Sequence, residues 1–328
     1  MSGLLYCLYT NEVPRLHELL SDNIFSKMTN TDCHKFTNIN HDTYNFVDDS
    51  TCIISFPDTR QIKSYLTNMY LLLHSYYTIN KLKINSDKTK LMIGYKNKHR
   101  EEIQNFHFMA KNDKIVNTNS IKILGFTLRY DNNLDTQIGN TCANLHYRLN
   151  LIRKITKFSQ FKDRLVMVKS LVIGKLLYAM PIYTQATEAQ IAKIHKVIMT
   201  ASRVIIGSYC FKKSTTYILD KCGLLSAKQM IAYSSITYLN KIYFNNKPTS
   251  IYELFIPINR RGTDLKIRTK LRAKTKKFKN HIINKGSEMV NSIPSEIKNL
   301  PPKTFKKQLK KYLHTHNMWE PDDLDIMT

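Results

Sequence analysis

Cysteines are few in this sequence and lie far apart. There are six, and no two have C-x-x-C spacing: Cys7, Cys33, Cys52, Cys142, Cys210 and Cys222. Zinc knuckles need closely paired cysteines, and small secreted domains need dense ones for their disulfides. The pattern therefore indicates neither a zinc knuckle nor a disulfide framework. We expect reduced thiols in an intracellular protein, and the pattern leaves nucleus and cytoplasm open.

Long apolar runs, glycine and proline are also rare. The apolar stretch 170–183 is shorter than the roughly 20 residues that span a bilayer, and Lys175 interrupts it. Met1 leads directly into an amphipathic segment, unlike a signal peptide. We therefore expect no membrane insertion. Glycine and proline number nine each and 42% of residues are hydrophobic, which is typical of a globular, mainly helical chain.

Acidic residues are half as numerous as basic ones, with 25 Asp and Glu against 50 Lys and Arg. Residues 1–130 carry 16 basic and 12 acidic side chains, whereas residues 131–328 carry the other 34 and 13. An excess of this sign attracts polyanions, chiefly nucleic acid or an anionic membrane face. Charge alone also fits a soluble basic protein from a lysine-prone genome.

Residues 1–130 have the periodicity of an α+β unit. We expect a helix over 3–20 and then two short β-prone runs, 43–47 and 50–55. Only two residues, Asp48 and Asp49, separate these runs, which is the arrangement of a tight hairpin. The hairpin is the clearest strand signal in the chain.

A further helix and two strands are expected in the same unit. Asp58 and Gln61 resemble a capping box, and apolar residues at helical spacing follow for about five turns. Residues 88–95 alternate between apolar and polar, and residues 121–130 are β-prone around Gly125. Both segments are predicted to be strands.

After residue 130 the pattern becomes helical. Apolar stripes at helical spacing predict helices over 134–152 and 161–171. A helix over 187–207 opens with a T-x-x-Q capping box and ends near a glycine, and another is expected over 226–243. We place a domain boundary near residue 131.

The most basic part of the chain, residues 260–311, has 17 Lys and Arg against three acidic residues. Within it, residues 265–279 are typical of a phosphate-contacting arm, although a solvated basic helix fits them equally well. The candidate nucleic-acid-binding side chains are Lys266, Arg268, Lys270, Arg272, Lys274, Lys276 and Lys277.

Phe46-Val47-Asp48-Asp49 is the constellation that could carry chemistry. Two adjacent carboxylates at a hairpin tip are hard oxygen donors, and they can share a pair of Mg²⁺ ions if both face one cleft. Taken alone, two aspartates in a turn are more often a solvated turn. The neighbouring segments shift the balance toward function.

Four segments in order carry a family resemblance: LLYCLYTNEVP at 4–14, FVDD at 46–49, LKINSDKTK at 82–90 and ILGF at 123–126. They resemble, respectively, the tail of the template-contact motif, the F/Y-x-D-D palm motif, the L-x-x-N-x-x-K-T segment and the L-G primer-grip strand. These are motifs of the reverse transcriptases of non-LTR retrotransposons, of jockey-like and related elements.

The resemblance continues through the later part of the chain. The matching segments are LLYA at 176–179, ASRVIIG at 201–207, CGLL at 222–225, NSIPSEI at 291–297 and FKKQLK at 305–310. They look like the helical region and closing segments that follow the palm in these elements. A group II intron maturase is a more distant fit, because this tail is not typical of one.

The resemblance implies an α+β palm remnant over 1–130, in which an antiparallel hairpin and strands pack with helices. A mainly α-helical thumb-like region over 131–250 and a basic C-terminal helical extension over 251–328 would follow. The implied activity is synthesis of DNA on an RNA template with two Mg²⁺ ions. The implied partners are an RNA template, a DNA primer and deoxynucleoside triphosphates, with the oligomeric state left open.

The resemblance also implies roles for particular residues. Asp48 would be the firmest metal ligand, with Asp49 beside it, and Lys88 would assist the leaving pyrophosphate. A surface lysine at a strand end explains Lys88 equally well. The segment Leu124-Gly125-Phe126 would position the primer end, where Gly125 either lets a nucleic-acid backbone approach closely or marks a bulge.

One departure from the family pattern concerns catalysis. In the family an earlier strand supplies another metal-binding Asp, and fingers precede it; neither is found here, and Asp22, Asp32 and Asp42 fall in a polar loop. We therefore expect an N-terminally truncated polymerase fragment that is inactive alone. The alternative is a catalytically dead nucleic-acid-binding remnant. A basic helical scaffold would explain the charge but not the ordered motifs.

Overall fold

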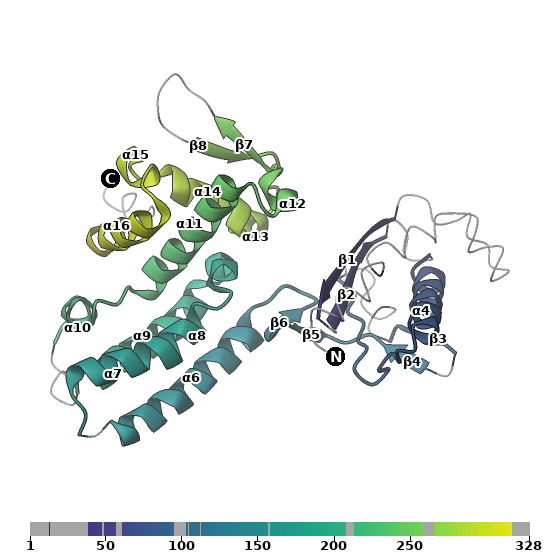
Figure 1. Cartoon of the computed structure of the whole chain (residues 1–328), viewed down its shortest axis with the longest axis horizontal. Helices are drawn as coiled ribbons and strands as arrows, with labels where there is room; N and C mark the ends of the chain where they lie inside the picture. The colour runs from purple at the N-terminus through teal and green to yellow at the C-terminus, as the bar shows by residue number, and fades with distance from the viewer. Residues whose placement is uncertain are drawn as a thin grey trace. The chain divides into compact units, whose positions relative to one another are not determined.

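The computed structural model describes residues 13, 39–47, 49–56, 61–94, 103, 105–111, 113–156, 158–207, 213–258 and 266–316, without the side chains of 257, 258 and 266. It divides into two compact units (Figure 1). The first comprises Met1–Ile123 and Thr127–Asn132, and the second comprises Leu124–Phe126 and Asn133–Thr328. The prediction of an α+β chain that is mostly helical is confirmed.

A two-stranded antiparallel hairpin packed on one helix forms the centre of the first unit. Strands β1 (Asn40–Phe46) and β2 (Asp49–Ser55) pair with Phe46 opposite Asp49, and α4 (Ile62–Ile79) follows. The predicted hairpin is therefore confirmed, but its turn falls between Phe46 and Asp49, one residue earlier than predicted, so Asp49 belongs to β2 and Val47 to the turn. The expected capping residue Asp58, the helix over 3–20 and, apart from Val13, the segment 4–14 lie outside the described residues.

One face of the hairpin is buried against α4. The core there contains Tyr65, Met69, Leu72 and Tyr77 of α4, with Cys52 and Ile54 of β2 packed against them. Two polar contacts join the same surfaces: His41 Nδ1 lies 2.8 Å from the Tyr65 hydroxyl, and Ser50 Oγ lies 3.2 Å from the Tyr77 hydroxyl. A two-stranded hairpin is marginal alone, so α4 supplies the burial that stabilises it.

Two strand predictions in the first unit are wrong. In the described part of 88–95 only Leu91 makes a bridge, to Asn117, so this segment is not a strand. Residues 121–130 are not one strand, because left-handed Leu124 (φ 48°) and Gly125 (φ 83°) turn the chain between β5 (Ser120–Ile123) and β6 (Phe126–Arg129). A further hairpin, β3 (His107–Ala110) with β4 (Asp113–Val116), escaped prediction because its strands are only four residues long.

The second unit is helical over most of its length. Its earlier elements are α6 (Asp135–Ile155), α7 (Phe161–Val168), π-helix η5 (Lys169–Ile173), α8 (Gly174–Leu176), 3-10 helix η6 (Met180–Gln185), α9 (Glu188–Ile206), α10 (Thr215–Cys222) and α11 (Ala227–Asn245). Its later elements are α12 (Thr249–Tyr252), β7 (Phe255–Ile258), β8 (Lys266–Thr269), α13 (Lys276–Lys279), α14 (Ile282–Asn291), α15 (Ser295–Lys298) and α16 (Pro302–Thr315).

The core of the second unit is built along α6, α9 and α11. Helix α9 contacts both α6 and α11, and α11 also contacts η6, α14 and α16. Fully buried side chains from the three helices fill this core: Ile138, Leu145, Leu149, Ile194, Ile198, Ile205 and Ile231. Burial of each such side chain stabilises the fold by about 1.5–3 kcal/mol. The buried positions therefore have to be apolar, and their helical spacing is visible in the sequence.

The buried face of the helix after α7 runs through Val172 and not through Leu171. The sequence predicted that Leu171 continues the buried stripe of 161–171, but Leu171 is exposed and Val172, Ile173 and Leu176 are buried instead. Val172 and Leu176 follow the buried Val168 by four and eight residues, which is also helical spacing. The guanidinium of Arg148 on α6 donates to the Leu171 carbonyl at 3.0 Å.

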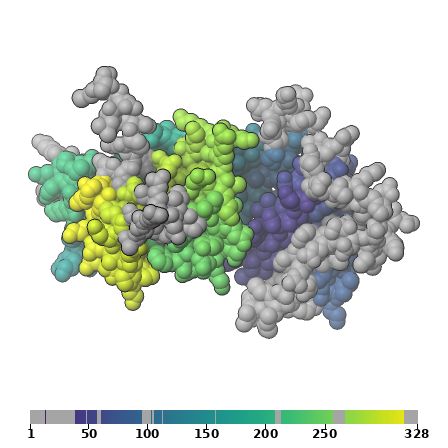
Figure 2. Space-filling view, turned by 90° about the horizontal axis from the view of Figure 1, so that it is seen from above, coloured from purple at the N-terminus to yellow at the C-terminus, as the bar shows by residue number. Residues whose placement is uncertain are grey.

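The C-terminal part of the second unit is not wholly helical, which corrects the expected helical extension over 251–328. Strands β7 and β8 form an antiparallel hairpin, and α13 to α16 follow. Residues 265–279 are therefore not one basic helix, because their described part contains a strand and the single turn α13. Figure 2 shows the segments after α11, green to yellow, packed as one continuous surface.

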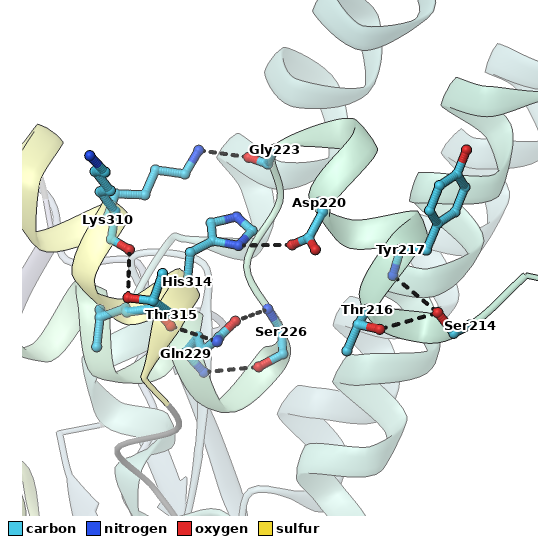
Figure 3. Close-up of polar contacts among 12 residues, drawn as sticks. Ser214, Thr216, Tyr217, Asp220, Gly223, Ser226, Gln229, Lys310, His314 and Thr315 are labelled. Carbon is cyan, nitrogen blue, oxygen red and sulfur yellow. Dashed lines mark hydrogen bonds and ion pairs between the residues drawn. The ribbon is translucent and has the colours of Figure 1, made fainter.

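Three polar contacts join helix α16 to α10, to the loop after it and to α11 (Figure 3). Lys310 Nζ donates to the Gly223 carbonyl at 2.7 Å, and His314 Nδ1 lies 3.1 Å from Asp220 Oδ1. Gln229 Nε2 donates to the Leu313 carbonyl at 2.6 Å and so satisfies a group at the helix end. The contacts join residues more than 80 positions apart, which no local sequence pattern predicts.

Among the described residues, no helix has the length and apolar character needed to cross a bilayer.

The capping box at the start of α9 gives a direct test of local stability. The Gln190 backbone N–H donates to Thr187 Oγ1 at 3.3 Å, and the Thr187 N–H donates to Gln190 Oε1 at 2.9 Å, as the sequence predicted. Thr187→Ala should lower the free energy of unfolding by about 1 kcal/mol, measured by urea denaturation. The control is Thr200→Ala in the same helix, whose hydroxyl donates only to Lys196 O. An equal loss in both variants would contradict the capping role.

Candidate functional site

The two-residue turn between β1 and β2 places Asp49 on the outer face of the hairpin. Asp49 lies opposite Phe46 and is exposed, while Asp48 lies outside the described residues. Val47 enters the turn with φ 54°, a left-handed conformation that is rare for a β-branched residue. Two-residue hairpin turns of type I′ require this conformation at their central residues, so the tight turn accounts for it.

The outer face of the hairpin carries large apolar side chains that are exposed to solvent. Cross-strand partners point to the same side, so Asp49 shares this face with Phe46, Tyr44 and Ile53. These three large side chains are 59%, 54% and 58% exposed. Asp42, which the sequence placed in a loop, lies on β1 on the same face, four residues from Phe46 along the strand. The face therefore combines carboxylates with aromatic rings that solvent reaches.

The inner face of the hairpin has a different chemistry. His41 Nε2 contacts Thr43 Oγ1 at 2.8 Å, and Thr43 Oγ1 lies 3.5 Å from Cys52 Sγ. Burial raises the pKa of the Cys52 thiol, although its contact with Thr43 opposes the rise. A thiol held neutral in this way is a poor nucleophile, so the inner face is structural and the outer face carries any chemistry.

The structure brings no complete metal-ligand set together in its described part. No group of three His, Cys, Asp or Glu side chains there could hold a metal ion. Asp49 offers one carboxylate on an accessible face, and the candidate Asp48 is its neighbour in the sequence. The described residues thus fit part of the ligand set that a pair of Mg²⁺ ions requires.

The sequence suggested that Lys88 lies at the end of a strand, but the structure places it in a turn. The Lys88 backbone N–H donates to Asn85 Oδ1 at 3.2 Å, and the Thr89 hydroxyl donates to Asn85 O at 2.9 Å. Asparagine commonly stabilises turns in this way. The N-x-x-K-T sequence therefore has a local structural reason for its Asn and Thr, whereas the exposed Lys88 side chain is left for solvent or a ligand.

Asp113 of β4 forms hydrogen bonds with both α4 and the turn that contains Lys88. The Tyr70 hydroxyl donates to Asp113 Oδ2 at 2.6 Å, and a hydrogen bond also joins the side chains of Asp113 and Ser86. The bond from Tyr70 is the main reason that the pKa of Asp113 lies below its usual value. The side chain of Ser86 lowers it further, as do the nearby His74 and Lys83.

The segment Leu124-Gly125-Phe126 forms the tip of the β5–β6 hairpin and belongs to the second unit. Leu124 and Gly125 are exposed, whereas Phe126 is buried with its ring 6.3 Å from that of Tyr183. A Cβ added to Gly125 would meet no atom within 4 Å. The glycine is therefore explained by its left-handed turn and not by crowding from the protein or by a bulge.

The basic candidates lie along β8, the segment after it and α13. Arg268, Lys270, Arg272, Lys274, Lys276 and Lys277 are all exposed, and the side chain of Lys266 lies outside the description. Asn291 holds β8 in place, since its amide contacts both Ile267 N at 2.9 Å and Ile267 O at 2.8 Å. With Ile267 facing the core, Arg268 is turned outward.

Sequence reasoning missed a second basic face on α16. Phe305, Leu309 and Leu313 are buried at helical spacing, so the intervening side chains face solvent. Its exposed lysines are Lys303, Lys306, Lys307 and Lys311. The i, i+4, i+8 spacing of the three apolar residues was the signal that could have revealed this face.

The contribution of Asp113 should depend on pH. Because its folded pKa is depressed, it stabilises the protein above the pKa of the unfolded chain, about 3.9, and loses this effect as pH falls through the folded value. Asp113→Asn should therefore lower the unfolding midpoint in urea at pH 7, and the difference from the native chain should shrink toward pH 3. The control Asp87→Asn removes an exposed carboxylate of the same turn. A pH-independent deficit in Asp113→Asn would contradict this assignment.

Comparison with known proteins gives no match: no family model fits the chain, and neither a curated protein nor a solved structure is significantly similar to it.

Proposed function

We propose that this chain is the palm and thumb part of a reverse transcriptase of the non-LTR retrotransposon type. The observation that carries the proposal is the position of Phe46-Val47-Asp48-Asp49 at a two-residue hairpin turn, with Asp49 on an exposed face. A solvated turn explains the aspartates and the left-handed Val47 but not the ordered motifs that follow. The palm, thumb and extension boundaries at 130 and 250 are part of the proposal.

In this proposal Asp48 and Asp49 hold Mg²⁺ from one side of the site. Two such ions, when bound, would activate the primer hydroxyl and carry the triphosphate. The chain's own residues bind and orient: the Asp49 carboxylate faces solvent on the outer surface of the hairpin, and the exposed Lys88 side chain is available to a pyrophosphate. Positioning and electrostatics supply nearly all of the catalysis in phosphoryl transfer.

The second unit would hold the template and primer. Residues 131–328 carry the larger share of the positive charge, and six of the seven candidate cations around β8 and α13 are exposed. Phosphate contacts supply most of the affinity and little sequence preference. The substrates in this proposal are an RNA template, a DNA primer and deoxynucleoside triphosphates.

A second candidate function is nucleic-acid binding without catalysis. It is favoured by the lack of a three-ligand group among the described residues, since one or two carboxylates from a single turn reach the ions from one side only. Both candidates require nucleic-acid binding, and only the first requires Asp48 and Asp49. The two experiments below separate them.

Binding should weaken steeply with salt. We expect the chain to bind a short RNA–DNA hybrid with a log–log salt slope of about −0.7 to −0.9 per phosphate contact, measured by fluorescence anisotropy. Replacing Lys270, Arg272 and Lys274 together with Gln should lower this slope by about two to three phosphate contacts.

The matched control replaces three exposed lysines of the first unit, Lys63, Lys81 and Lys114, with Gln. Both triple variants lose three positive charges. A difference between their salt slopes therefore depends on where the charges lie and not on net charge. Equal slopes in the two variants would rule out the proposed basic surface, and a native chain with no salt dependence would rule out the binding function altogether.

Primer extension tests catalysis. We expect Mg²⁺-dependent extension by a longer chain in which fingers and a first palm strand of a polymerase of this type are joined ahead of the 328 residues, and none by the 328-residue chain alone. Asp48→Ala or Asp49→Ala in the longer chain should reduce extension by on the order of 10²-fold or more, because a transition-state contact is lost. Asp42→Ala removes a carboxylate from the same face and should leave extension unchanged. Extension that survives Asp48→Ala and Asp49→Ala would exclude the proposed catalytic roles.

A further inference from the structure

Tyr178 joins the hairpin tip to the helical body of the second unit. It lies in the turn between α8 and η6, next to Ala179, which has φ 55°. The Tyr178 hydroxyl donates to the Leu124 carbonyl, 54 residues away in the sequence. Five residues after Tyr178, the ring of Tyr183 lies against Phe126. One short stretch of chain therefore holds both ends of the Leu124-Gly125-Phe126 turn.

The hydroxyl bond acts at a backbone position that needs support. Leu124 has φ 48°, and an L-residue with a side chain disfavours this left-handed conformation. Donation to its carbonyl fixes the Leu124–Gly125 peptide plane in one orientation. Beside it, the space that a side chain on Gly125 would occupy contains no protein atom within 4 Å. The tip thus presents a rigid and uncovered stretch of backbone.

A cation lies over the same tyrosine. Lys175 Nζ is 5.4 Å from the centroid of the Tyr178 ring, within the range of a cation–π contact, and both residues are exposed. An ammonium group, an aromatic face and an open glycine backbone thus occur around one turn. Proteins that bind single strands combine these features, with the cation on a phosphate and the ring beside the nucleotide.

We propose that Tyr178 is a positioning residue for nucleic acid: its hydroxyl fixes the Leu124–Gly125 turn, and its ring steadies Lys175 so that the ammonium contacts a phosphate of the strand passing Gly125. The identity of that strand as the primer rests on the proposed function. The phosphate contact itself requires only that the chain binds nucleic acid.

The chain offers a matched control in Tyr217 of α10. Tyr178 and Tyr217 are both 45% exposed, and Tyr217 also lies under a lysine, with Lys213 Nζ 5.6 Å from its ring centroid. Figure 3 shows the Tyr217 side chain directed away from the neighbouring polar contacts. Replacing either tyrosine with Phe removes a hydroxyl and keeps the ring. Only Tyr178→Phe removes a bond to the hairpin tip.

The experiment measures binding of a primer–template hybrid to the 328-residue chain by anisotropy over a range of salt concentrations. Lys175→Gln should reduce the salt slope by about one phosphate contact. Tyr178→Phe should weaken binding about fivefold, the loss expected for one hydrogen bond. It should also reduce the slope in the same way, because a strand that the released Leu124–Gly125 turn no longer holds moves away from Lys175. The double variant should be no weaker than the weaker single variant, because both changes remove one contact. Tyr217→Phe should change neither quantity.

Several outcomes would overturn the inference. Tyr178→Phe could bind like Tyr217→Phe, or it could bind less tightly with an unchanged salt slope, which would indicate a structural role alone. Additive losses of affinity in the double variant would show that Tyr178 and Lys175 act on different contacts. If the native chain binds the hybrid and these variants match it, only this inference fails; if the native chain binds no nucleic acid, the proposed function fails with it. Thermal unfolding of each variant shows whether it folds. If Tyr178→Phe does not fold, the salt slope of Lys175→Gln alone tests the phosphate contact.

Discussion

The constraint on which the candidate site depends is that α4 covers one face of the two-stranded hairpin. His41, Ser50 and Cys52 lie on that face and make polar and apolar contacts with α4. The strict alternation of side chains along a strand then directs Phe46 and Asp49 to solvent. An exposed carboxylate beside exposed aromatic rings is thus a consequence of how the hairpin obtains its stability.

The second unit is arranged around α11 in a comparable way. Apolar faces of α9, α14 and α16 cover this helix, and each of these elements keeps its charged side chains on the outside. Tertiary contacts such as Lys310 with Gly223 and Asn291 with Ile267 fix the C-terminal elements on the core. Exposed cations therefore lie on elements packed against the core and on the segment between β8 and α13.

Turns, more than helices, position the residues that the proposals use. Val47, Leu124 and Ala179 all adopt left-handed conformations without being glycine, and each lies next to a residue that the proposals use. Non-glycine residues in this region persist only where the surrounding structure holds them. For Leu124 the structure identifies such a contact, the hydroxyl of Tyr178.

The sequence by itself determined the features that depend on neighbours in the chain. Apolar spacing predicted the long helices, Thr187 and Gln190 predicted the start of α9, and the Asp48-Asp49 pair predicted the hairpin turn to within one residue, because periodicity, capping and turn geometry act over a few residues. Only the tertiary structure decided that the described part of 88–95 is not a strand, that Val172 and not Leu171 is buried, and that Tyr178 holds the tip at Leu124. Each of these outcomes depends on a partner distant in the chain or on competition for the core, and a local pattern contains neither.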